Sequence, residues 1–335
     1  MKTLWTQKGF LITVGGLLLA AILPLFASEY ALHIIILVLL YAYLSTAWNI
    51  LGGYGGQHSL GHSLFLGIGA YTSTFLFTKV GLTPWVGMWV GAFLAGLVGW
   101  FVGYLCFRYG LKGPYFALVT IAIAEAMVSL TNNLNFVGGA MGLEVKWQGH
   151  SPLLMQFEGK ASYYYIILVM VVVAIWLVHW LSRQRFGYHL IAVRENEDAA
   201  EALGVDTLRT KIQASVISAI LTALGGTFFA QYFTYINPRN VFGEGPSIQI
   251  LLFSIVGGLG TVWGPAIGAL VLVPIAELAR GWLGGSFAGA HLLLYGMVMV
   301  LVMLFMPKGI MGLYENIHQR LKHDTHAPKK ERTSA

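Results

Sequence analysis

The sequence predicts an all-α protein, a polytopic bundle of transmembrane helices. Of the 335 residues, 57% are hydrophobic and only 10% are charged, whereas soluble domains carry about 25% charged residues. The hydrophobic residues also gather in long stretches, and several of these reach the roughly 20 residues that one helix needs to cross a bilayer. Composition and pattern together therefore place the chain in a membrane.

Ten apolar stretches are candidates for these crossings, so we expect about ten spans. They are residues 10–27, 30–51, 62–78, 83–107, 114–131, 162–181, 212–236, 247–263, 265–279 and 289–306. The first stretch is longer than the 7–15-residue apolar core of a signal peptide, so we expect it to be retained. The glycine-rich junctions 52–61 and 257–264 carry no charge. Either can dip into the membrane without crossing it, and the expected count is therefore eight to ten.

Lysine and arginine residues predict the orientation of these spans. If the N-terminus is cytoplasmic, fifteen of the twenty lie on the cytoplasmic side, and five lie outside: Lys79, Lys146, Lys160, Arg239 and Arg280. Cytoplasmic loops of membrane proteins are enriched in these residues. We therefore expect both termini in the cytoplasm. The net charge of +6 then reflects topology and not nucleic-acid binding.

The chain is predicted to form one transmembrane domain, residues 1–313, followed by a basic tail. Residues 314–335 are polar and lack hydrophobic periodicity, which is typical of disordered segments. The extracytoplasmic loop 132–161 is rich in glycine. It is either a cap over an outer entrance or a plain connector, and composition alone leaves both open.

The fourth stretch carries a stripe of small residues. Gly87, Gly91, Ala95, Gly99 and Gly103 recur every four residues. Such spacing lets a neighbouring transmembrane helix approach closely. We therefore interpret the stripe as a packing surface.

The cytoplasmic loop 182–211 holds ten of the thirty-four charged residues and predicts a short helix. Asn196 is a suitable N-cap, Glu197 favours the first helical turn, and Gly204 suits a left-handed stop. The predicted helix covers about residues 197–203. Isolated helices below about 12–15 residues are marginal in water, so this one needs a surface to pack against.

Several classes of chemistry are excluded by the sequence. A single cysteine, Cys106, forms no intrachain disulfide, and no phosphate-binding G-x-x-x-x-G-K-[ST] loop or G-x-S-x-G elbow is present. His58 and His62 are four residues apart, but His58 lacks the neighbouring glutamate of a zinc protease. Residues 52–70 fit a helix break with close backbone contacts better. We expect no catalytic residue, metal or cofactor in this chain.

Two acidic residues, Glu125 and Glu277, lie inside predicted spans. Ionisable groups in a bilayer face protein or water, because their burial in lipid is costly. Glu277 precedes Arg280 by three residues, so an ion pair on one helix face accounts for it. Glu125 shares a small, polar face with Ala122 and Ser129. It lines a path or bonds a neighbouring helix, and the sequence leaves both open.

Six segments resemble, in order, the permease family of ATP-binding-cassette importers for branched-chain amino acids, and within it the M-type subunit. They are GQHSLGHSLFLGIGAYTS (56–73), LKGPYFALVTIAIAE (111–125), VGGAMGL (137–143), RENEDAAEALGVDTLRTK (194–211), GGLGTVWGPAIGA (257–269) and MPKGIMGL (306–313). The resemblance covers about residues 30–313. Gln57 and His58 depart from the small or apolar residues expected there.

The resemblance implies a transporter in the bacterial inner membrane with several partners. These are a second related permease, two cytoplasmic ATPase subunits that bind the ATP and magnesium, and an extracytoplasmic substrate-binding protein. Related permeases act on urea, short amides or other amino acids, so these substrates remain alternatives. An ion-coupled secondary transporter, with Glu125 and Glu277 as proton sites, is the alternative of another class.

The resemblance also implies two sets of functional residues. Loop 182–211 resembles the loop that docks on the ATPase, and its coupling residues are Arg194, Glu195, Asn196, Glu197, Ala199, Ala200, Leu203 and Gly204. Ala199, Ala200 and Leu203 are expected to face the ATPase. Glu195, Glu197 and Glu201 are expected to meet basic residues at its rim. The candidates for the translocation path are Ser59, Gly61, His62, Tyr71, Tyr115, Glu125, Ser129 and Glu277.

Overall fold

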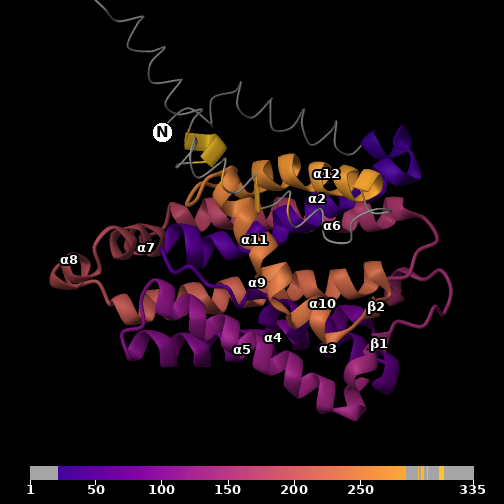
Figure 1. The fold of residues 1–335 in the computed structure, drawn as a ribbon, viewed down its shortest axis with the longest axis horizontal. Coiled ribbons are helices and arrows are strands. Elements are labelled where there is room, and N and C mark those ends of the chain that lie inside the picture. The colour runs from indigo at the N-terminus through magenta and orange to yellow at the C-terminus, as the bar shows by residue number, and fades with distance from the viewer. Residues whose placement is uncertain (1–21, 284–292, 294–295, 298–299, 301–308, 313–335) are drawn as a thin grey trace, which may run out of the picture.

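The long helices of the protein lie side by side along one direction, which gives the bundle two distinct ends (Figure 1). The structure is a computed structural model that describes residues 22–283, 293, 296–297, 300 and 309–312. Helices α7 (Arg185–Glu195) and α8 (Glu197–Ala202) project from one end, called the α8 end here. Strands β1 (Leu143–Glu144) and β2 (Tyr235–Ile236) lie at the opposite end, the β end.

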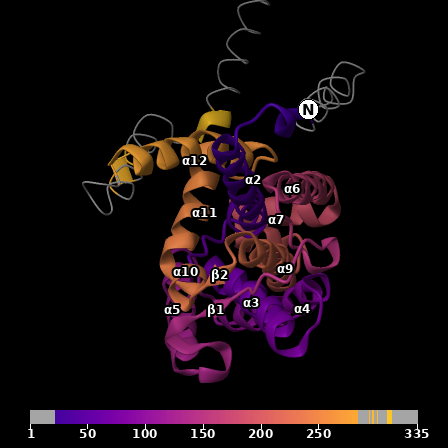
Figure 2. The same ribbon diagram turned by 90° about the vertical axis from the view of Figure 1, so that its right-hand side faces the viewer.

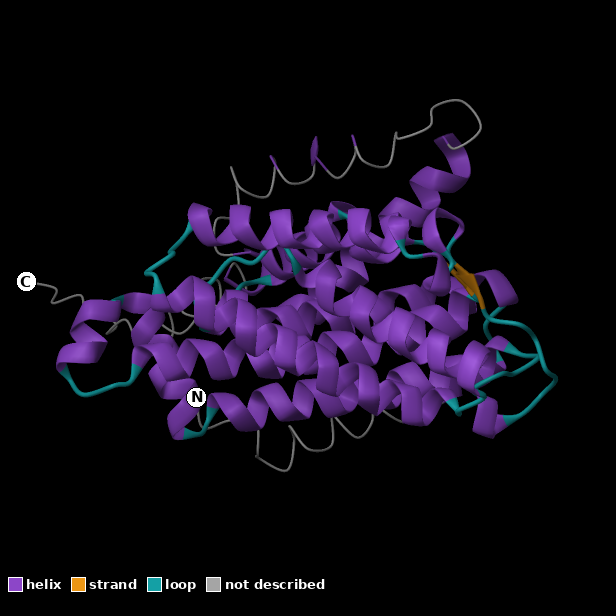
Figure 3. Cartoon of the chain, turned by 90° about the horizontal axis from the view of Figure 1, so that it is seen from below, coloured by secondary structure: helices purple, strands orange, loops and turns teal. Residues whose placement is uncertain are grey.

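Five helical segments are long and apolar enough to cross a membrane. They are α2 with its π-helical continuation η2 (Glu29–Tyr54), α4 (Pro84–Arg108), α5 (Pro114–Asn133), α6 (Lys160–Ser182) and α9 (Thr207–Phe233). Each matches one predicted stretch, and Figure 3 shows how completely helices dominate the described chain. The all-α membrane fold is therefore confirmed. The predicted stretches 10–27 and 289–306 and the tail 314–335 lie wholly or largely outside the described residues.

Three further predicted stretches are helical, and two of these α-helices have only 14 residues. Helix α3 (His62–Phe75), continued by the π-helical turn η3 (Leu76–Val80), and helix α11 (Glu244–Gly257) have 14 residues each, whereas α12 (Gly264–Leu283) has 20. The five-residue helix α10 (Pro238–Phe242) precedes α11. Short 3-10 turns complete the helices: η1 (Leu23–Leu25), η4 (Asn135–Val137), η5 (Gly139–Met141) and η6 (Pro152–Leu154).

The core forms around α9, which packs most extensively against α4 and α3. The small-residue stripe of α4 makes this packing close, as the sequence predicts. The Ser215 hydroxyl of α9 donates a hydrogen bond of 2.9 Å to the carbonyl of Gly99. A Cβ atom on Gly91 would lie only 3.1 Å from the Cα of Gly69 in α3. Helix α2 lies on the other side of α9, where α6, α11 and α12 surround it.

The predicted outer loop 132–161 is folded onto the β end, which faces the viewer in Figure 2. β1 pairs with β2 in antiparallel register, with Leu143 opposite Ile236. The amide of Gln156 donates to the carbonyl of Lys146 at 2.8 Å, and the indole of Trp85 in α4 donates to the carbonyl of Pro152 at 3.0 Å. These contacts fasten the loop to α4 and to the end of α9.

Candidate functional site

The predicted short helix in the charged loop is present as α8 (Glu197–Ala202), one residue shorter than predicted. The side-chain oxygen of Asn196 accepts a hydrogen bond of 2.9 Å from the amide of Ala199, and Gly204 closes the helix with a φ of +87°. The sequence interpretation missed helix α7, which carries Arg194 and Glu195 in its last turn. Both helices project from the α8 end (Figure 1).

The surface of α8 differs from the one expected for docking. Leu203 is 85% exposed, and Ala199 is also exposed. Ala200 is only 3% exposed, because it lies on the side of the short helix that packs on its own chain. The expected three-residue apolar face is therefore wrong for Ala200 and reduces to Ala199 and Leu203.

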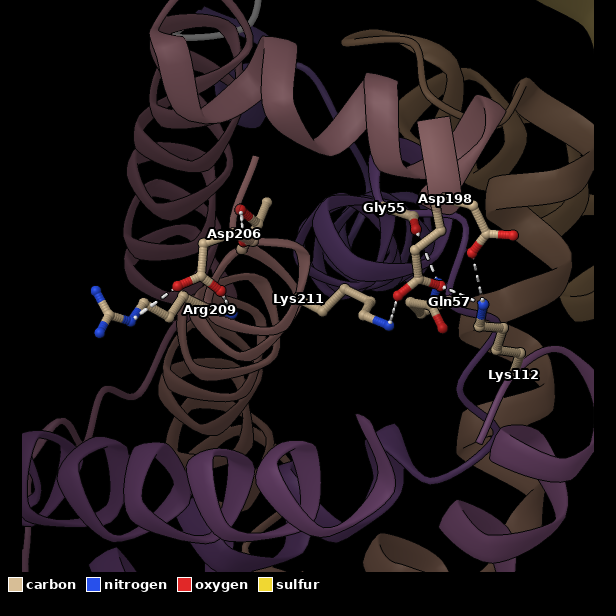
Figure 4. A network of polar contacts seen from close by, with 9 residues as sticks. Gly55, Gln57, Lys112, Asp198, Asp206, Arg209 and Lys211 are labelled. Atoms are coloured by element: carbon tan, nitrogen blue, oxygen red, sulfur yellow. Dashed lines mark hydrogen bonds and ion pairs between the residues drawn. The ribbon is translucent and has the colours of Figure 1, made fainter. Parts of the chain in front are cut away.

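Glu197 makes its contacts within the chain. Its carboxylate pairs with Lys112, in the α4–α5 turn, at 3.0 Å, and accepts a hydrogen bond from Lys211 of α9. Figure 4 shows these two lysines reaching the same carboxylate from different elements. Lys211 is 2% exposed, and its ammonium lies 5.0 Å from the ring centroid of Phe107. Glu197 therefore ties α8 to α9 and to the α4–α5 turn.

The charges of this cluster reinforce one another. Burial by itself raises the pKa of Glu197, but hydrogen bonds from Lys211 and Lys112 outweigh it and hold the pKa below its ordinary value. The hydrogen bond to Glu197 raises the pKa of Lys112 in return. The carboxylate thus stays ionised at neutral pH and holds both lysines.

The first glycine-rich junction, residues 52–61, starts within the π-helical η2 and returns into the bundle as irregular chain from residue 55. The indole of Trp48 donates to the carbonyl of Ser59 at 2.8 Å, and the amide of Leu60 donates to the Thr120 hydroxyl of α5 at 3.1 Å. Helix α3 then begins at His62, beside Ser218. Ser218 lies eleven residues into α9, roughly 16 Å from its first residue. Helix α3 therefore starts deep inside the bundle.

His62 holds this turn in place. Its side chain is fully buried; its Nδ1 lies 3.1 Å from the Ser59 hydroxyl and its Nε2 lies 2.7 Å from the Ser218 hydroxyl. Because Ser218 donates its own proton to the carbonyl of Ala47 at 2.7 Å, it accepts from Nε2. Both ring nitrogens are thus engaged by serines. Within the described part of the chain, no group of three histidine, cysteine or acidic residues is placed to hold a metal ion.

Helix α11 begins beside the start of α3, at the same depth in the bundle. The amide of Ser63 donates to the Ser247 hydroxyl of α11 at 2.8 Å, and the Ser63 hydroxyl donates to the carbonyl of Phe242 in α10 at 2.8 Å. The ring of Phe242 stacks on Tyr71 with centroids 5.3 Å apart. The chain thus enters from the β end as α10 and begins α11 beside the start of α3. The predicted path residues Ser59, Gly61, His62 and Tyr71 belong to this buried region.

The remaining path candidates lie elsewhere. Tyr115, Glu125 and Ser129 are exposed along one face of α5, and the Glu125 carboxylate accepts a hydrogen bond of 3.2 Å from the amide of Glu244 at the start of α11. Glu277 pairs with Arg280 on α12 at 2.8 Å. The ion pair that the three-residue spacing predicts is therefore confirmed, and Glu277 lies apart from the other candidates.

The sequence interpretation missed Asn49, at the end of α2. Its amide nitrogen donates to the carbonyl of Thr261 at 2.9 Å, and its amide oxygen accepts from the amide of Gly260 at 2.9 Å. It therefore joins the end of α2, which leads into the first junction, to the second junction, residues 257–264. The signal available in the sequence was an asparagine at the end of an apolar stretch. Lys112, between two predicted spans, and Lys211, the last residue of the charged loop, were comparable signals.

A sequence model of the family described as "Branched-chain amino acid transport system / permease component" matches residues 30–304. The chain belongs to this family. This permease is accordingly a multi-pass membrane protein and a transport component, which is not a catalytic enzyme.

Curated relatives of the permease are of two types. The chain is 29% identical over 334 residues to the high-affinity branched-chain amino acid transport system permease protein LivM of Escherichia coli K12, covering 92% of this chain and 76% of LivM. It is 26% identical over 273 residues to the probable LivM of Methanocaldococcus jannaschii, covering 74% and 77%. It is 23% identical over 292 residues to LivH of Escherichia coli K12, covering 81% and 91%. No solved structure matches the chain.

Two cavities of the permease border the broken helices. One, lined by Ser59, Gly61 and Thr120 among others, has a volume of about 10 Å³, enough for about one water molecule. The other is an apolar groove of about 550 Å³ between α3, α4 and α5, with Leu64, Phe101 and Ile123 in its walls. The first is too small and the second too apolar to pass an amino acid with its two charged groups.

Proposed function

We propose that this permease is the M-type subunit of an ATP-binding-cassette importer that moves branched-chain amino acids into the cell by ATP-driven alternating access. The observation that carries the proposal is α8, a doubly capped helix that leaves Leu203 exposed at the end of the bundle. A secondary transporter has no use for a helix built in this way. The names of the LivM and LivH relatives support the substrate.

The proposed topology has ten spans with both termini in the cytoplasm of a bacterial cell, in its inner membrane. The α8 end then faces the cytoplasm. Arg183, Arg185, Arg194, Arg209 and Lys211 all belong to the loop at this end. Their concentration there follows the tendency of lysine and arginine to remain in the cytoplasm.

The proposed translocation path runs along the exposed face of α5. Glu125 lies eleven residues into this 20-residue helix, close to mid-membrane, and an exposed carboxylate at that depth faces water or protein and not lipid. The second permease, of the H type, is proposed to close the path from the other side. Relatives of both types support a shared path.

The remaining partners are assigned to the two ends. Two ATPase subunits, which bind the ATP and magnesium, are proposed to hold α8 through Leu203 and Ala199. The substrate-binding protein is proposed to dock over the folded loop 132–161. ATP closure then displaces α8, and the ion cluster around Glu197 transmits the movement to α9 and the α4–α5 turn, since a packed, paired contact moves as a unit.

The test is uptake by the complete transporter. Both permeases and the ATPases are reconstituted in proteoliposomes with the binding protein. Entry of labelled leucine is measured with ATP inside, with ATP outside and without ATP, and each measurement is repeated with a protonophore. We expect saturable uptake that requires ATP and is unchanged by the protonophore. Uptake that persists without ATP and collapses with the protonophore would establish an ion-coupled transporter instead. Competition by urea, short amides and other amino acids then defines the substrate.

A further inference from the structure

The two glycine-rich junctions, distant in sequence, touch each other at the α8 end of the permease. Asn49 bonds Gly260 and Thr261 of the second junction, as described above. A Cβ atom on Gly53, in the first junction, would lie only 2.6 Å from the amide nitrogen of Gly260. Backbone therefore packs directly on backbone, which a side chain at Gly53 would prevent.

Arg194, in the last turn of α7, occupies the space beside this contact. Its Nη1 donates to the carbonyl of Gly53 at 3.1 Å. A Cβ atom on Gly56 would lie 2.7 Å from the Cγ of Arg194, and one on Gly260 would lie 2.5 Å from its Nη1. Gly56 and Gly260 have φ angles of +67° and +68°. The absence of side chains at Gly56 and Gly260 is thus what admits the arginine.

The neighbouring residue sets the orientation of the guanidinium. One carboxylate oxygen of Glu195 accepts hydrogen bonds from Nε at 3.1 Å and from Nη2 at 2.7 Å. Two nitrogens are therefore held by Glu195, and the third is left to reach Gly53. The planar guanidinium allows this division, whereas the single ammonium of lysine does not.

We infer that Arg194 is a positioning residue that acts inward, and that it couples the displacement of α8 to both glycine-rich junctions at once. Arg194 precedes the N-cap of α8 by two residues, so any movement of α8 reaches its backbone directly. Its side chain contacts the junction before α3 and the junction before α12. The two junctions are therefore displaced together, as a gate at the α8 end requires. The inference rests on the proposed function, but its structural half stands independently.

The experiment uses the complete transporter in lipid nanodiscs and proteoliposomes with Arg194→Gln and Arg194→Lys. The matched control is Arg209→Gln, because Arg209 lies in the same loop but is exposed and pairs with Asp206. Two quantities are measured: amide hydrogen exchange in residues 53–57 and 257–261, and leucine molecules imported per ATP hydrolysed.

We expect faster exchange in both segments for Arg194→Gln and an import ratio lowered about tenfold, the scale on which single residues alter coupling between sites. Arg194→Lys keeps the charge and the aliphatic stem and serves if the glutamine variant does not assemble. It is expected to show the same two changes to a smaller extent. The control leaves both quantities at their wild-type values.

Unchanged exchange in both segments would overturn the inference, and so would a change confined to one junction. An import ratio that stays at the wild-type value despite faster exchange would also overturn it, since the contact then transmits nothing. A different outcome is that Arg194→Gln exchanges faster in both segments, while the wild-type transporter imports leucine without ATP. It would refute the proposed function while leaving the contact between Arg194 and the two junctions in place.

Discussion

Helices α5 and α6 are the least covered of the five long spans, and they lie on opposite sides of the bundle (Figure 2). Their exposed faces differ. That of α6 carries Val169, Val173 and Trp176, whereas that of α5 carries Glu125 and Ser129. Apolar side chains with tryptophan towards one end are typical of a surface in contact with lipid. A carboxylate at mid-depth is typical of a protein or water interface. The two helices are similarly uncovered, and their exposed faces predict different neighbours in the membrane.

The largest expected effect comes from placing one acid on each face. We expect Val173→Asp in α6 to disfavour membrane insertion by about 3 kcal/mol, since the new carboxylate faces lipid. Ala122→Asp in α5, one turn from Glu125, is expected to insert normally because this face already carries the exposed Glu125 and Ser129. The amount of folded protein in purified membranes measures the difference. Equal losses for the two variants would remove the distinction between the helices.

The second effect concerns the attachment of α8 to α9 and to the α4–α5 turn. Glu197→Gln removes the charge that pairs with Lys112 and Lys211, and it leaves Lys211 buried with a weaker partner. We expect the variant to lose about 2 kcal/mol, the scale of hydrogen bonds to charged groups. Thermal unfolding of the complex and protease cleavage within residues 182–211 report the loss. Glu201→Gln, an exposed position on the same helix, is the control and leaves both measurements unchanged.

The third effect separates the two roles left open for Glu125. Glu125→Gln keeps an oxygen that accepts from the amide of Glu244 but removes the charge. If Glu125 lines the path, uptake falls about fivefold, corresponding to roughly 1 kcal/mol, and the unfolding temperature stays unchanged. Wild-type uptake in this variant would mean that the hydrogen bond to α11 is the whole role of the residue.

The smallest effect is a pH dependence at the α8 end. The pKa of Glu197 is lower in the folded protein than its ordinary value of 4.5. Its contribution to stability is therefore complete above about pH 4.5 and is lost as the pH falls through the lowered pKa. We expect the protease sensitivity of residues 182–211 to be flat from pH 8 to pH 5 and to rise below that range. In Glu197→Gln we expect no such rise in protease sensitivity below pH 5. An identical rise in that variant would mean that another group titrates there.

The sequence predicted those features that depend on neighbouring residues. Apolar length predicted α2, α4, α5, α6 and α9, and the caps at Asn196 and Gly204 predicted α8, because both signals are local. The depth at which α3 begins is set instead by Ser218, 156 residues away. No local pattern names that partner, although the predicted stretch 62–78 matches α3 with its π-helical continuation, and α11 falls on the stretch 247–263.

In the candidate site, too, the features set by local spacing were predicted and those set by tertiary contacts were not. The ion pair of Glu277 with Arg280 follows from a spacing of three residues and was predicted. The partners of Glu197 come from the α4–α5 turn and from α9, and the burial of Ala200 depends on the same tertiary packing. Arg194 was recognised as part of the coupling loop, but its contact with Gly53 spans 141 residues. Its inward direction was therefore beyond the reach of sequence patterns.

One measurement tests the central claim most directly, namely that α5 lines a path operated by ATP while α6 faces lipid. Spin labels are attached to single cysteines at Ser129 and Val173, with Cys106 replaced, in the complete transporter. Their accessibility to oxygen and to a water-soluble nickel chelate is measured with and without ATP. We predict that the label at residue 173 contacts lipid in both states, whereas the label at residue 129 gains or loses contact with water when ATP binds. Equal, ATP-independent exposure of both labels to lipid would contradict the account.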